Sequence, residues 1–174
     1  MLRKSIMGKA TIVALFLLFG IIVTIVNNIE PAQANHHGES TALTGQDYEE
    51  IKALYARYNQ GSDFRDTELF LSAFAEDAVM TREGGDIVGM EGLRADRARR
   101  YQGETGDVGR RHINGSYLIT PTAEGAESRA YYILMDVTVR PPNVISSGFY
   151  EDEFVKTDVG WKIQHRTLYR DTLD

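Results

Sequence analysis

The spacing of apolar residues changes halfway along the chain, and this change constrains the fold more than any other feature. Between about residues 44 and 101 apolar side chains recur mostly at helical spacing, whereas from Arg110 onward they alternate with polar ones. Helices that come first and long strands that come later favour helices packed on one face of a curved antiparallel sheet. The sequence therefore predicts a single domain of the α+β class.

Local signals set the expected bounds of the elements. Thr44 with Asp47 three residues later resembles a capping box, and the helix that it starts is expected to end at Gly61. Asp66 is expected to cap a second helix. The remaining expectations are a helix at 67–74, strands at 78–82 and 87–88, a basic helix at 90–101, and long strands at 110–120, 128–140, 147–156 and 161–171.

The N-terminal segment predicts export. Three basic residues precede Ala10 to Val26, a run of 17 uncharged residues, and the sequence Ala32-Gln33-Ala34 follows. We expect residues 1–34 to be a signal peptide cut after Ala34, residues 35–45 a flexible tail, and residues 46–174 the domain. The alternative is an uncleaved membrane anchor. In both cases the domain is exported, either secreted or periplasmic or held at the membrane outside the cytoplasm.

The charge of the mature chain argues against nucleic acid and anionic membranes as partners. Removing Arg3, Lys4, Lys9 and Glu30 from the totals of 19 basic and 25 acidic residues leaves 16 and 24, a formal net charge of −8. Membrane contact is expected only if the N-terminal segment stays attached. The chain has no cysteine and no phosphate-binding or zinc-protease motif, so we expect no cofactor and no metal in the domain.

A cut after Ala34 would leave Asn35-His36-His37 at the new N-terminus. An α-amine, two backbone amides and an imidazole at the third residue suit copper(II) or nickel(II). The reading that we favour is a polar tail whose histidines bind no metal.

Several stretches resemble a known superfamily in their order and spacing. They are Leu54-Tyr55-Ala56-Arg57-Tyr58 followed by Asp63, Asp66, Phe74, Asp77 and Ala78, then Arg111-His112, then Gly160-Trp161-Lys162-Ile163 with Arg166. Over about residues 46–171 the chain resembles the nuclear transport factor two-like superfamily and, within it, the SnoaL-like branch. That branch is similar to scytalone dehydratase, bile-acid dehydratase and ketosteroid isomerase.

The resemblance implies a cone-shaped barrel, a curved antiparallel sheet wrapped around the N-terminal helices with an internal apolar pocket. The superfamily's dehydratases and isomerases move protons in that pocket without metal or organic cofactor. Carried over, their catalytic residues are Asp63, Tyr58 and His112, with Asp136 as a second acid. Several relatives carry an asparagine at about Ser116, and this chain departs there. The superfamily also commonly dimerises through the outer sheet face.

These side chains suffice for proton chemistry. An imidazole takes or gives a proton near neutral pH, and a carboxylate beside it fixes the tautomer. A tyrosine hydroxyl donates to a carbonyl oxygen as charge develops there. Asp63, His112 and Tyr58 could therefore remove a proton next to a carbonyl, with loss of water or migration of a double bond.

Each candidate also has a structural interpretation. Asp63 could form a turn, Tyr58 could be a core residue, His112 could lie on a solvated strand face, and Asp136 could pair with a base. For substrate binding we predict Tyr55 and Phe74 as pocket walls, with Asn114 close by. Arg166 could bind an anionic substrate group, but structural pairing with Asp136 or Glu153 is favoured.

Three further groups are expected to be structural. His165 shares its strand face with Trp161 and Ile163, so we expect it in the core. The acidic cluster Glu151 to Glu153 reads as exposed strand. A basic run is expected to form a solvated helix face. It consists of Arg94, Arg97, Arg99 and Arg100.

Two functions remain open. The leading hypothesis is a cofactor-independent lyase or isomerase, dehydratase-like, that acts on a small apolar carbonyl compound. The alternative is an exported small-molecule-binding or interaction domain without catalysis. In both cases the expected partner is a small-molecule ligand. We also expect a homodimer that buries Tyr131, Ile133 or Tyr150.

Overall fold

The computed structural model describes residues 42–103 and 107–172. The predicted signal peptide and the Asn35-His36-His37 sequence lie outside these residues, so their expectations stay predictions. Within the described ranges, no helix is both long enough and apolar enough to span a membrane.

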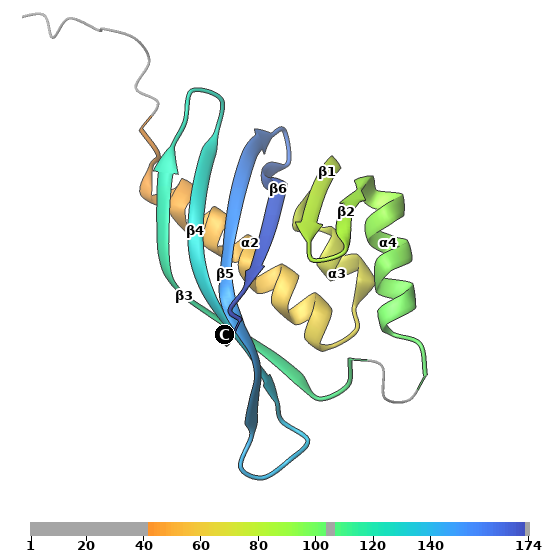
Figure 1. The fold of residues 1–174 in the computed structure, drawn as a ribbon. Helices are drawn as coiled ribbons and strands as arrows, with labels where there is room; N and C mark the ends of the chain where they lie inside the picture. Colours follow the sequence, from red (N-terminus) through yellow and green to blue (C-terminus); the bar gives the residue numbers. More distant parts are fainter. Residues whose placement is uncertain (1–41, 104–106, 173–174) are drawn as a thin grey trace, which may run out of the picture. The chain divides into compact units, whose positions relative to one another are not determined.

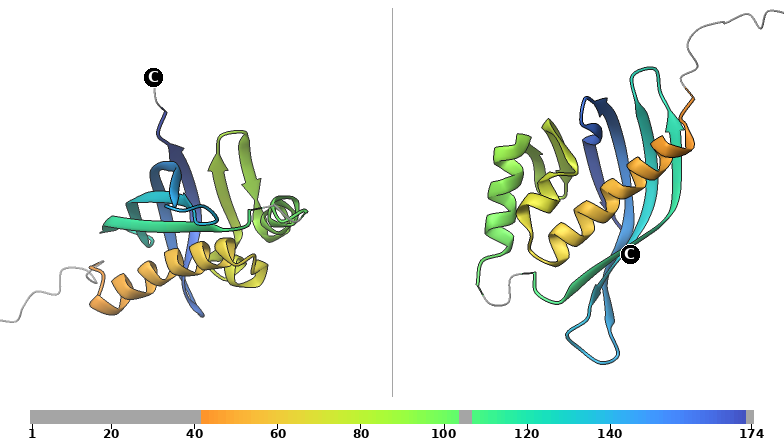
Figure 2. Two further views of the ribbon diagram at one scale, coloured as in Figure 1. Left: turned by 90° about the horizontal axis from the view of Figure 1, so that it is seen from below. Right: turned by 180° about the vertical axis from the view of Figure 1, so that it is seen from behind.

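Helices pack against one face of a six-stranded curved sheet (Figure 1). In the view from behind, α2 runs diagonally across the strands, α4 lies beside β1 and β2, and α3 lies next to α2 and α4 (Figure 2). We call the face against α2 the inner face and the opposite face the outer face. The elements are α2 (Gly45–Asp63), α3 (Thr67–Leu71), β1 (Phe74–Arg82), β2 (Gly85–Val88), α4 (Gly89–Arg100), β3 (Arg110–Pro121), β4 (Ala126–Asp136), β5 (Asn143–Thr157) and β6 (Gly160–Arg170).

The strand order is β2-β1-β6-β5-β4-β3, which confirms the predicted α+β fold. The sheet is open at β2 and β3, so the cone is not a closed barrel. One pairing departs from the predicted antiparallel pattern, because β1 and β6 run parallel. These strands are far apart in the sequence, and β2, the helix α4 and the strands β3 to β5 lie between them.

The predicted helix starts are confirmed. Thr44 accepts a hydrogen bond from the Asp47 amide, and the Asp47 carboxylate accepts one from the Thr44 amide. Asp66 caps α3. The predicted stop at Gly61 is wrong, because α2 continues to Asp63. A Cβ at Gly61 would lie 2.3 Å from the Phe70 amide nitrogen, so this glycine permits the close approach of α3.

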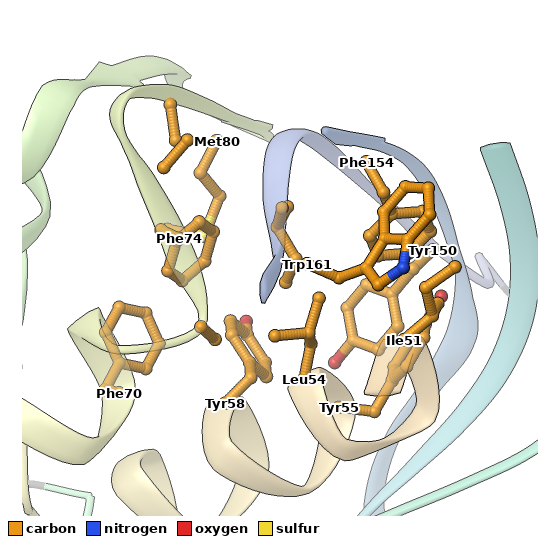
Figure 3. Packing of buried hydrophobic residues seen from close by; sticks show 14 of the residues in the cluster. Ile51, Leu54, Tyr55, Tyr58, Phe70, Phe74, Met80, Tyr150, Phe154 and Trp161 are labelled. Carbon is orange, nitrogen blue, oxygen red and sulfur yellow. The ribbon is translucent and has the colours of Figure 1, made fainter. Parts of the chain in front are cut away.

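The core lies between α2 and the sheet (Figure 3). Ile51, Leu54, Tyr55 and Tyr58 follow the predicted helical spacing and are all buried. They contact rings and aliphatic side chains from α3, β1, β5 and β6, and each such buried side chain contributes roughly 1.5–3 kcal/mol. Asp47 also joins the start of α2 to the sheet, because its carboxylate accepts hydrogen bonds from Trp161 Nε1 at 2.8 Å and from Lys156 at 2.7 Å.

Two extra residues in the strands change which side chains face inward. In β6, Ile163 is opposite Phe154 but His165 is opposite Glu153, so Gln164 forms a bulge. Arg166 therefore turns inward and is fully buried, whereas His165 lies on the outer face. The prediction that His165 is a core residue is wrong for this reason. A second bulge in β3, next to Ser116 with a φ of 54°, turns Tyr117 inward against Tyr55.

Two predicted boundaries differ between β4 and β5. β4 ends at Asp136 rather than at residue 140, and β5 begins at Asn143 rather than at residue 147. Phe74, which we predicted in a helix, begins β1.

The outer face carries an apolar patch at one end of the sheet. Tyr131 is 59% exposed and Ile133 42% exposed, and Phe149 stacks on Tyr169 with ring centroids 4.7 Å apart. Tyr150 is 1% exposed and packs in the core, so its predicted place in a dimer interface is wrong. The homodimer itself stays a prediction.

Candidate active site on the inner face

A histidine–aspartate pair links the end of α2 to the start of β3. His112 Nδ1 lies 2.6 Å from Asp63 Oδ1, and the His112 backbone amide donates to Asp63 Oδ2 at 2.9 Å. The side chain of Asp63 is 4% exposed and that of His112 12%. The structure thus brings together two of the residues that the sequence predicts as catalytic.

This geometry fixes the histidine tautomer. An ionised carboxylate accepts hydrogen bonds and donates none, so Nδ1 carries the proton that lies between the two side chains. In the neutral ring Nε2 is then left with its lone pair. Because Asp63 also holds the backbone amide of His112, both the ring and its strand are positioned by one carboxylate.

His112 faces a cavity of about 380 Å³ on the inner face, beneath the strands β3 to β6. Tyr58 lines the same cavity, and its ring meets the His112 ring edge-on with the centroids 6.1 Å apart. Among the described residues, the Tyr58 hydroxyl makes no hydrogen bond. Asp63 is not a lining residue and lies behind His112, where a carboxylate orients an imidazole without touching the ligand.

A buried arginine lies beneath the tyrosines. Arg166 donates two hydrogen bonds to Asp152, at 2.7 and 2.9 Å, and both side chains are 0% exposed. Its guanidinium carbon lies 4.3 Å from the ring centroids of Tyr58 and Tyr150. Burial alone would lower the pKa of Arg166, but Asp152 outweighs burial and raises that pKa further. The guanidinium is therefore a fixed positive charge next to Tyr58.

Tyr55 completes this buried network. Its hydroxyl donates to Asp152 and lies 2.7 Å from Ser128 Oγ. Burial and the neighbouring Asp152 carboxylate raise the pKa of Tyr55 well above its ordinary range, so the phenol stays neutral. Arg166 thus has a structural partner, as favoured from the sequence, but the partner is Asp152. The prediction that Glu151 to Glu153 is exposed strand is wrong for Asp152, which is 3% exposed.

Four other predicted site residues do not line the cavity. The carboxylate of Asp136 accepts hydrogen bonds from the amide and hydroxyl of Thr138, which is a turn contact and not a contact with His112. Tyr55 and Phe74 belong to the core behind the cavity wall. Asn114 accepts a hydrogen bond from Asn59 on α2.

Sequence reasoning missed a charged wall of the same cavity. Asp96 of α4 is 1% exposed, and hydrogen bonds from Arg82 and Arg97 hold its carboxylate. Arg97 is 3% exposed, so the predicted solvated helix face is wrong at that position. Asp96 lies within the basic run, three and four residues before Arg99 and Arg100. This spacing could have indicated from the sequence that the arginines surround a carboxylate.

A second hollow of about 450 Å³ lies on the outer face. Glu127, Glu151 and Glu153 line it together with His165, whose Nε2 lies 3.0 Å from the Thr81 hydroxyl. It contains no carboxylate that holds its histidine by a hydrogen bond. In the part of the chain that the structure describes, no cluster of three or more His, Asp or Glu could hold a metal.

Solved structures of the same fold resemble this chain. A protein of unknown function with a cystatin-like fold from Nostoc punctiforme is 27% identical with a TM-score of 0.67, covering 74% of this chain and 94% of its own. A protein of unknown function from Mycobacterium tuberculosis is also 27% identical, with a TM-score of 0.63 and coverage of 74% and 73%. ActVI-ORFA from Streptomyces coelicolor, 20% identical, shares the fold with a TM-score of 0.64, over 71% of this chain and 97% of its own.

No curated protein matches the chain. The model of the SnoaL-like domain matches residues 44–167, well over half of the sequence and nearly all of the described fold. The match spans both Asp63 and His112, the strands β1 to β5 and most of β6. This chain therefore belongs to the SnoaL-like domain family.

Proposed function

We propose that this protein is a cofactor-independent lyase or isomerase that removes a proton next to a carbonyl group. The observation that carries the proposal is the pair of His112 and Asp63, whose oriented imidazole faces a cavity large enough for a small organic molecule.

Four side chains carry the proposed chemistry. His112 Nε2 takes the proton from the carbon next to the carbonyl, and the electron pair of that bond moves to the carbonyl oxygen. The Tyr58 hydroxyl donates a hydrogen bond to this oxygen as negative charge develops. The nearby Arg166 guanidinium stabilises that negative charge through the tyrosine. Asp63 stabilises the imidazolium that results.

The imidazolium then returns its proton. If the substrate carries a hydroxyl on the next carbon, the proton goes to that oxygen, the carbon–oxygen bond breaks and water leaves. If the substrate is an unsaturated ketone, the proton goes to the distal carbon and the double bond migrates. Both routes balance without any further reactant.

Hydrogen–deuterium exchange tests the proton abstraction before the natural substrate is known. The protein is incubated in deuterium oxide with a panel of aryl ketones and β-hydroxy ketones, and loss of the α-proton signal is followed by NMR. We expect catalysed exchange for members that fit the cavity. His112→Gln should abolish the exchange.

The matched control is His165→Gln, which removes the histidine of the outer hollow. Exchange that persists in His112→Gln, or that disappears equally in His165→Gln, would contradict the proposal. Ligand binding without any exchange in the wild-type protein would instead favour a non-catalytic binding domain.

A further inference from the structure

Five arginines form one wall of the inner cavity, and they indicate the charge of the ligand that the cavity binds. The cavity is lined by five arginines and only two acidic side chains, Asp107 and Glu83. The domain as a whole is acidic, so the lining of this cavity is more basic than the chain on average. The five arginines come from β1, α4, β3 and β6, and they are Arg82, Arg97, Arg100, Arg110 and Arg170.

The acids nearby do not neutralise this wall. Asp96 holds Arg82 and Arg97 and also lies 3.3 Å from Arg100. Asp107 lies 3.1 Å from Arg110 and 3.8 Å from Arg100, and Glu83 lies 3.9 Å from Arg170. Three carboxylates therefore face five guanidinium groups. Burial together with the positive charges of Arg82 and Arg97 lowers the pKa of Arg100, which is the response expected where like charges are crowded.

Donor groups on this wall are also left without acceptors. The Arg97 side chain is only 4% exposed, and its buried Nε has no hydrogen-bond partner among the described residues. Nε of Arg100 lies 3.3 Å from Asp96 Oδ2 but makes no hydrogen bond. Buried donors normally find a partner, so these two Nε atoms show that the nearby carboxylates do not satisfy all the donors of the wall.

The wall also lies next to the catalytic pair. Arg97 donates to Ser62 Oγ at 3.2 Å, and Ser62 immediately precedes Asp63 in α2. Arg110 lines the cavity two residues before His112 on the same strand face. A ligand whose reacting carbon is close to His112 therefore presents its other end to arginines.

We propose that the inner cavity takes a carbonyl compound that carries an oxyanion, a carboxylate or a phosphate, and that Arg97 and Arg100 bind this group. Guanidinium groups match both oxyanions because they donate in parallel pairs. The inference rests on the proposed function only in assigning the ligand to the same cavity. It replaces the expectation of a purely apolar substrate with that of an amphipathic one.

The test uses binding rather than turnover. Titration calorimetry compares 2-naphthoate and 2-naphthyl phosphate with 2-naphthamide, a neutral amide of nearly the same shape as the carboxylate. For the wild-type protein we expect at least one oxyanion to bind about tenfold more tightly than the amide, which is about 1.4 kcal/mol. The stronger of the two oxyanions identifies the group, and added salt should reduce the preference.

A pair of neighbouring variants makes the test specific. Arg100→Gln should reduce the preference to within about threefold, since one guanidinium of the wall is lost. Arg99→Gln is the control, because Arg99 contacts Asp96 from the same helix but does not line the cavity. Arg110→Gln serves as a second wall variant if Arg100→Gln does not fold.

Equal affinity of wild type for amide and oxyanions would overturn the inference, and so would failure of both oxyanions to bind at millimolar concentration. Equal loss in Arg99→Gln and Arg100→Gln would also overturn it, because it would place the effect in the Asp96 cluster. If the charge preference holds but no proton exchange is found, the oxyanion site stands and the proposed catalysis fails.

Discussion

The inner and outer faces of the sheet use the same residue types with opposite results. On the inner face Arg166 and Asp152 form a pair that is 0% exposed, whereas on the outer face Arg129 and Glu151 form a pair with side chains 57% and 38% exposed. Each face also has a histidine beside a hollow, but only His112 is clamped by a carboxylate. Burial by α2, rather than residue type, separates a candidate reaction site from a solvated surface.

The largest expected difference between the faces is in turnover. Asp63→Asn should lower α-proton exchange by roughly 10³- to 10⁴-fold, because an amide at this position disfavours the productive tautomer of His112. Exchange is measured by NMR in deuterium oxide. Circular dichroism should show an unchanged fold, and exchange at the wild-type rate in the folded variant would remove Asp63 from the mechanism.

The two ion pairs should differ strongly in their effect on stability. Asp152→Asn leaves the Arg166 charge buried without its counter-ion, which should lower the free energy of unfolding by roughly 3–5 kcal/mol. Glu151→Gln, at the preceding residue of β5, removes the outer partner and should change stability far less, because water solvates Arg129. Urea unfolding followed by fluorescence measures both. Similar losses in the two variants would show that burial does not separate the pairs.

Substitutions at two glycines compare a tightly packed position with an open one. Gly61→Ala places a methyl group where it would overlap the Phe70 backbone, so we expect a loss of roughly 1–3 kcal/mol. Gly115→Ala on β3 has nothing within 4 Å of the added carbon and should be close to neutral. Thermal unfolding of both variants gives the comparison, and equal unfolding temperatures would contradict the tight α2–α3 contact.

The smallest expected difference concerns acid titration. Burial raises the pKa of Asp96, but hydrogen bonds from Arg82 and Arg97 outweigh burial and lower the pKa to about 2. A lowered folded-state pKa stabilises the protein above the ordinary value of 3.8, and this contribution is lost as the pH falls from about 3.8 through about 2.

Carbon-detected NMR can measure this titration while the native signals persist. The Asp96 carboxyl should titrate near pH 2. The carboxyl of Glu151, whose pKa the Arg129 hydrogen bond also lowers, provides the outer-face comparison. A midpoint for Asp96 at or above 3.8 would mean that the arginine cluster does not hold this carboxylate.

Much of the fold could be read from local patterns. The capping box at Thr44, the helical spacing of Ile51, Leu54 and Tyr55, and the alternation in the second half each depend on neighbours a few residues away. The resemblance to a superfamily suggested Asp63 and His112 as partners, although 49 positions separate them in the sequence.

What only the tertiary structure decided was the face on which a charged side chain lies. Strand alternation has a period of two, so the bulge at Gln164 reverses the assignment of every later residue of β6. His165 was therefore placed in the core, although it lies outside, and nothing in the local sequence marks the extra residue.

The buried charges depend on partners that are distant in the chain. Asp152 lies among acidic neighbours and is buried only because Arg166 and Tyr55 come from other elements to meet it. Arg97 is likewise buried because Asp96, Ser62 and the Phe70 ring surround it. A charged side chain is stable in a core only when a group of opposite charge is buried next to it. That arrangement is a property of the packed structure.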